Sequence, residues 1–130
     1  MNNYLTAIGW WNFAGSIIML GLFNENFGKK MMNDWCKIFK TEFVLDYWGK
    51  FWMGWAIGLN IFFGLMNILS VAWGVREIKT FLIYSDLVAY TCFFGLAIWG
   101  MKAGRTLSGI YSVFVIFGFW IVWGVISLQS

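Results

Sequence analysis

The chain has 130 residues, of which 61% are hydrophobic and 22% aromatic, while only 12% are charged. A soluble domain is about 45–50% apolar and about 25% charged, and so short a chain has too little interior to hide this many aromatic rings from water. The composition therefore excludes a water-soluble monomer, a disordered chain and a disulfide-built secreted domain, and it predicts an integral membrane protein.

Four stretches are long enough to cross a hydrocarbon layer of about 30 Å, which needs about 20 apolar residues in a helix. The predicted spans are residues 5–23, 51–73, 81–101 and 107–128. Fourteen of the fifteen charged side chains fall outside these spans, and the exception is Asp86 in the third. The pattern predicts an all-α membrane protein with a single domain, residues 1–130, in which four transmembrane helices form a compact bundle.

Residues 27–46 make up most of the one long segment between predicted spans. Apolar side chains recur there at intervals of three and four residues, and lysines occupy many of the other positions. A helix with such separated faces is typical of the membrane interface, with its apolar side in the acyl boundary and its lysines toward anionic headgroups. We expect an interfacial amphipathic helix, whose apolar face contacts lipid or, alternatively, a partner protein. The residues of this face are Met32, Trp35, Phe39 and Phe43.

The second span is rich in small and amide side chains, which allow close packing and hydrogen bonding between helices in lipid. Gly54 and Gly58 form a GxxxG pattern, and Asn60 and Gly64 lie one turn apart further along the helix. In the first span, Asn12 offers a similar amide. We expect these side chains to make the second span the centre of packing inside the bundle. We favour this over a dimer interface, because GxxxG alone is a weak signal for dimerisation in a glycine-rich apolar segment.

Asp86 is the most informative residue of the third span. An ionised carboxylate is costly there unless it faces the bundle or a water-filled cavity. Because a tight loop joins the second and third spans, Asn67 and Ser70 should lie opposite Asp86, with Tyr90 one turn deeper. Each of these side chains could donate a hydrogen bond to the carboxylate. We favour a buried polar clasp between the two helices, and the alternative is a site that couples protons or cations to transport.

Lys and Arg side chains gather in two of the loops. Loops 24–50 and 102–106 together carry seven of them, whereas the loop between the second and third spans carries only Arg76 and Lys79. Cytoplasmic loops of membrane proteins are enriched in these residues. We therefore expect loops 24–50 and 102–106 in the cytoplasm, and both termini of this multi-pass protein on the non-cytoplasmic side.

The chain contains no histidine, and its spans contain no cluster of carboxylates. Histidine is the commonest general base and a frequent zinc and haem ligand. We therefore predict no catalytic residue, no metal site and no bound cofactor, and we expect that the protein is not an enzyme. The net charge of +3 is small and dispersed, which argues against nucleic acid as a partner.

The function that fits these features best is an accessory or structural subunit of a larger membrane-protein complex. Its expected partners are membrane lipids and other integral membrane subunits. Two alternatives stay open. One is a small oligomeric transporter or channel that uses Asp86 for coupling, and the other is a binder of an apolar ligand such as a quinone, a pigment or a lipid.

Overall fold

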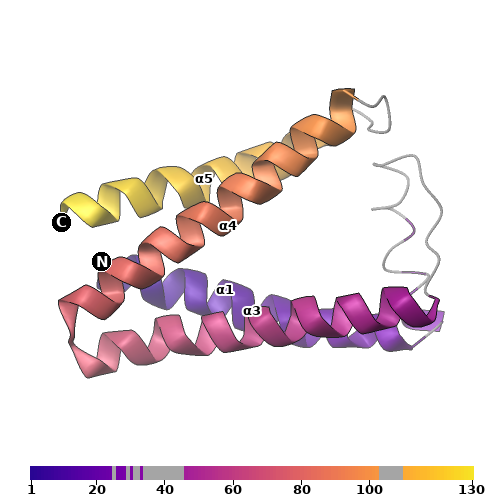
Figure 1. The fold of residues 1–130 in the computed structure, drawn as a ribbon, viewed down its shortest axis with the longest axis horizontal. Coiled ribbons are helices and arrows are strands. Elements are labelled where there is room, and N and C mark those ends of the chain that lie inside the picture. The colour runs from indigo at the N-terminus through magenta and orange to yellow at the C-terminus, as the bar shows by residue number, and fades with distance from the viewer. Residues whose placement is uncertain (25, 29, 31–32, 34–45, 103–109) are drawn as a thin grey trace.

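The computed structural model describes residues 1–24, 26–28, 30, 33, 46–102 and 110–130 (Figure 1). In this part of the chain every regular element is a helix, and there is no strand. The elements are α1 (Asn2–Leu20), the short 3-10 turn η1 (Gly21–Phe23), α3 (Tyr47–Trp73), α4 (Arg76–Lys102) and α5 (Ile110–Gln129).

Among the described residues, three helical stretches are long and apolar enough to cross a membrane: Asn2–Phe23, Tyr47–Trp73 and Arg76–Lys102. The last helix contributes a shorter apolar stretch, Val113–Gln129. The prediction of an all-α protein with apolar helices at these positions is therefore confirmed. Helices α3 and α4 begin earlier than the predicted spans, because the predicted spans exclude charged residues, and these lie near the start of both helices: Lys50 in α3, and Arg76, Glu77 and Lys79 in α4.

The two ends of α3 are both defined by local chemistry. Oδ1 of Asp46 accepts a hydrogen bond from the backbone N–H of Gly49 at 2.6 Å and so caps the first turn. At the other end Gly74 takes a left-handed conformation, with φ +73°, and its N–H donates to the carbonyl of Ser70 at 3.2 Å. Glycine adopts this conformation without the steric cost that a Cβ would bring. The resulting tight turn sets the antiparallel register of α3 and α4.

The four helices form two pairs (Figure 1). Helix α1 packs along α3, and α4 packs along α5, whereas contacts between the two pairs are sparse. The pairs meet at the end that carries both termini and the α3–α4 turn, and they diverge toward the other end. We call these the joined end and the diverging end.

The main apolar core lies toward the joined end. Side chains of α1, α4 and α5 form it: Tyr4, Leu5, Ile8, Leu82, Ile83, Tyr90 and Trp120. From α3, Phe63 and Met66 pack against this cluster. A second cluster among the described residues is small and joins only α4 and α5, through Ala97 and Val113. The structure thus differs from the predicted compact bundle, because the two pairs share a core over only part of their length.

Helices α1 and α3 approach most closely where Gly9 faces Gly64. A Cβ at Gly64 would lie 2.9 Å from the carbonyl oxygen of Gly9, and a Cβ at Gly9 would lie 2.8 Å from that of Gly64. Small residues permit this approach of two backbones, which is how helices pack tightly in lipid. Gly64 was predicted as a packing residue, and Gly9 is its partner.

The predicted packing role of Gly54 and Gly58 is not what the structure shows. A Cβ at Gly58 would meet no atom within 4 Å, and one at Gly54 would reach only the ring of Phe23, at 3.7 Å. The buried face of α3 carries Ile57 and Gly64, which are seven residues apart. Since each residue turns a helix by about 100°, Gly58 points away from this face. The GxxxG pattern therefore does not mark the seam between α1 and α3.

The predicted interfacial helix cannot be compared with the structure. Most of segment 27–46 lies outside the described residues, and so do Met32, Trp35, Phe39 and Phe43. The amphipathic helix stays a prediction from the sequence.

Candidate functional site

Asp86 and Asn67 form the centre of a polar cluster between helices. Asp86 on α4 is only 4% exposed, and Asn67 on α3 is fully buried. Nδ2 of Asn67 donates to both carboxylate oxygens of Asp86, at 3.0 and 3.2 Å. The tight turn at Gly74 brings the two residues to the same level. A carboxylate removed from water needs such hydrogen bonds, so this contact is what makes the position of Asp86 tolerable.

Ser70 and Tyr90 do not bind Asp86, which corrects the sequence prediction for both residues. The Ser70 hydroxyl donates to the backbone carbonyl of Asn67 at 2.7 Å, because serine in a helix readily bonds the carbonyl of the preceding turn. The Tyr90 hydroxyl donates to Oδ1 of Asn12 at 2.8 Å. Tyr90 therefore connects α4 to α1, and Asn12 joins the cluster.

A cavity of about 90 Å³ lies beside Asp86, between the two helix pairs. Its wall comes from α1, α3 and α4 and combines amides, a carboxylate and hydroxyls with apolar side chains: Asn12, Asn60, Phe63, Ser85, Asp86, Ala89, Tyr90 and Phe93. A polar cavity of this size has room for water, which needs about two to four polar partners. Asn60, a predicted packing residue, thus lines a cavity instead of a tight helix seam.

Two buried polar atoms near the cluster have no hydrogen-bond partner among the described residues. They are Oδ1 of Asn67 and the hydroxyl oxygen of Tyr4. Leaving such an atom unpaired costs about 1–3 kcal/mol. The amide nitrogen of Asn67 donates to Asp86, whereas the amide oxygen has room to accept a hydrogen bond from a further donor.

The cluster offers one carboxylate, two neutral amides and a phenol, drawn from three helices. Such a set can hold helices together, or it can bind a proton or a small cation at Asp86. In the described part of the chain, no three His, Cys, Asp or Glu residues lie close enough together to hold a metal ion. The cluster therefore combines hydrogen bonding with a single acid, Asp86.

Comparison with protein-family models, with curated proteins and with solved structures finds no match to this chain. The candidate site is accordingly defined by the geometry of Asp86, Asn67, Asn12 and Tyr90 alone.

Proposed function

We propose that this protein is a non-catalytic subunit of a larger membrane-protein complex, with α1, α3, α4 and α5 as four transmembrane helices. The proposal rests on the divergence of the two helix pairs and on the many large apolar side chains that the described residues leave uncovered. Lipid alone can cover such side chains. A partner helix, however, packs against them through many close contacts, and such packing is what drives helix association in membranes.

The uncovered side chains toward the diverging end include several of the largest. On α3 they are Trp52, Trp55 and Leu59, and on α4 they are Leu96 and Trp99, each about half or more exposed. Aromatic side chains are enriched at interfaces between proteins, because they bury a large area with few rotatable bonds. These side chains therefore suit contact with the helices of another subunit.

In this proposal the Asp86 cluster has a structural role. The bond from Asn67 to Asp86 joins α4 to α3, and the bond from Tyr90 to Asn12 joins α4 to α1. Both bonds cross between the two helix pairs. They would hold the angle between the pairs constant, so that the surface offered to a partner is formed before the partner binds.

The experiment that tests the proposal is purification of the full chain from its native membrane in mild detergent, with mass analysis of what co-purifies. A photo-reactive amino acid at Leu96 should crosslink to an integral membrane subunit. The same group at Phe81, which is similarly exposed near the joined end, is the control and should label lipid. Recovery of a lone stable monomer, with only lipid crosslinked at Leu96, would overturn the proposal.

A second candidate is transport coupled to protons or cations, and the cavity that Asp86 borders favours it. Asp86→Asn separates the two functions. The amide oxygen of the variant still accepts a bond from Asn67, so a clasp survives, whereas a proton or cation site is lost. Co-purification of the partner with Asp86→Asn is expected for the subunit. A cation flux in vesicles that the wild type supports and Asp86→Asn abolishes would favour the transporter instead.

A further inference from the structure

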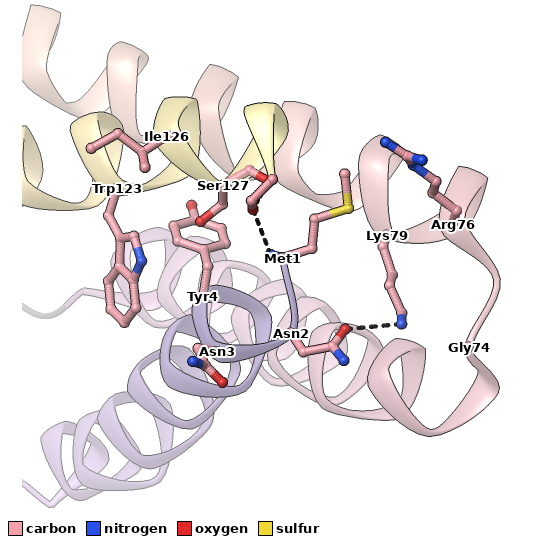
Figure 2. A pocket seen from close by; sticks show the side chains of 11 residues that line it. Met1, Asn2, Asn3, Tyr4, Gly74, Arg76, Lys79, Trp123, Ile126 and Ser127 are labelled. Carbon is pink, nitrogen blue, oxygen red and sulfur yellow. Dashed lines mark hydrogen bonds between the residues drawn. The ribbon is translucent and has the colours of Figure 1, made fainter.

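A second and larger cavity, of about 630 Å³, lies at the joined end (Figure 2). Its wall is formed by the start of α1, the α3–α4 turn with the start of α4, and the end of α5. Lys79 reaches from α4 toward Asn2, and Trp123, Ile126 and Ser127 come from α5 on the other side. None of its lining residues belongs to the Asp86 cavity. We call it the basic cavity, because the side chains of Arg76 and Lys79 line it.

The basic side chains of Arg76 and Lys79 lie one turn apart on α4. Lys79 is only 9% exposed, and its Nζ donates to Oδ1 of Asn2 at 2.9 Å. That amide oxygen is neutral, and among the described residues neither cation forms an ion pair with a carboxylate. Because the Lys79 side chain lines the cavity, an anion bound there would supply a counter-charge to it and to Arg76.

The basic cavity continues into an apolar groove on α5. Trp123 and Ile126 line both, and the groove has a volume of about 580 Å³. The other residues of the groove are Val115, Gly118, Phe119 and Val122. From Val115 to Ile126 the helix rises by about 16 Å, at about 1.5 Å per residue. One leaflet of a hydrocarbon layer about 30 Å thick has nearly the same depth.

We propose that the basic cavity and the groove together bind one anionic phospholipid, with its headgroup phosphate at Arg76 and Lys79 and an acyl chain along α5. Phosphate oxygens accept charge-assisted hydrogen bonds from guanidinium and ammonium groups. Trp123 lies where the two parts meet, and an indole ring is favoured at the boundary between headgroup and acyl chain. The groove is what selects a lipid over free phosphate. This site is independent of the proposed subunit role.

The experiment measures lipid binding to the purified full chain by native mass spectrometry. The probes are phosphatidylglycerol, a diacylglycerol with the same acyl chains, and inorganic phosphate. The wild type should bind phosphatidylglycerol more tightly than either other probe, since only this molecule fills both the cavity and the groove. Combining Arg76→Gln with Lys79→Gln should weaken the binding of phosphatidylglycerol about tenfold or more, because charge-assisted hydrogen bonds are lost.

A matched control separates the site from a general effect of charge. Lys50→Gln with Lys102→Gln removes the same charge at the other ends of α3 and α4, and it should leave lipid binding unchanged. Arg76→Gln alone serves if Lys79 is needed for folding, because the Arg76 side chain is exposed.

The groove has a control pair of its own. Gly118→Leu fills the groove, whereas Gly95→Leu places the same side chain elsewhere, and a Cβ at either glycine meets no atom within 4 Å. Gly118→Leu should weaken phosphatidylglycerol binding several-fold, and Gly95→Leu should not.

Three results would overturn the proposal. The first is an affinity for phosphatidylglycerol that stays at the wild-type value in the variant with Arg76→Gln and Lys79→Gln, or in Gly118→Leu. The second is binding of inorganic phosphate as tight as that of the lipid, which would indicate a site for a free anion. The third is a photo-reactive residue at Val122 that crosslinks a protein, and no lipid, in the native membrane.

Discussion

At the scale of single residues, the position of Asp86 inside the protein depends on Asn67. Both carboxylate oxygens receive their bonds from the one amide nitrogen, while Ser70 and Tyr90 bond elsewhere. The sequence placed Asn67 and Ser70 at the right level, because the short α3–α4 turn sets the register of adjacent helices. It did not distinguish them, because the rotation of each helix about its axis decides which side chain faces Asp86.

Asn67→Ala should lower the free energy of unfolding by about 1–3 kcal/mol, since it leaves a buried carboxylate without its donor. Ser70→Ala is the control. It removes a bond within α3 only, and it should cost less than about 1 kcal/mol. Unfolding in detergent followed by circular dichroism measures both. Equal losses of stability would show that Asn67 has no special role at Asp86.

Gly64 and Gly58 differ in what surrounds them, although both are glycines of α3. Gly64→Ala should lower the free energy of unfolding by about 1–3 kcal/mol, because the new Cβ would press on the backbone of α1. Gly58→Ala meets no neighbour and should be neutral or slightly stabilising. Unfolding in detergent, followed by circular dichroism, compares the stability of the two variants. A Gly58→Ala variant as unstable as Gly64→Ala would contradict the observed seam.

At the scale of the elements, the α3–α4 hairpin is the unit that local sequence specifies best. Apolar length predicts its two helices, and Gly74 between them supplies the left-handed turn. Helices α1 and α4 lack such a link. Because no short loop connects them, nothing in the sequence sets their register, and the bond from Tyr90 to Asn12 was not predicted.

Gly74→Ala should strain the hairpin by about 1–2 kcal/mol, because a residue with a Cβ pays this amount in the left-handed conformation. Gly95→Ala lies in the open middle of α4 and should instead gain about 0.5–1 kcal/mol from its better helix propensity. Thermal unfolding of the two variants in the same detergent compares them. A stabilising effect of Gly74→Ala would rule out the turn as described.

At the scale of the whole molecule, the two helix pairs share one core and separate beyond it. Composition indicates that apolar side chains outnumber what a small interior can bury, but it does not say where they stay uncovered. That location follows from the angle between the pairs. The angle depends on packing among Tyr4, Leu82, Ile83 and Trp120, which are far apart in the sequence.

Orientation in the membrane is a prediction at this scale. In a chain whose Cys36 and Cys92 are replaced by serine, Asn3→Cys and Gln129→Cys should react with an impermeant thiol reagent from the non-cytoplasmic side. The reason is that seven of the nine Lys and Arg residues belong to loops 24–50 and 102–106, which are predicted to be cytoplasmic. Lys50→Cys is the control and should react only after the membrane is opened. Labelling of residues 3 and 129 from the cytoplasm would reverse the assigned topology.

The sequence by itself determined the helical class, the positions of the apolar helices and the isolation of Asp86 among uncharged residues. These are local properties, since the length of an apolar stretch and the cost of placing a charge in it depend on that segment alone. Only the tertiary structure decided that Gly9 meets Gly64, that Tyr90 bonds Asn12, and that Arg76 and Lys79 border a cavity that continues along α5. Each of these depends on how helices that no short loop connects rotate and pack against one another, and hydropathy carries no information about that rotation.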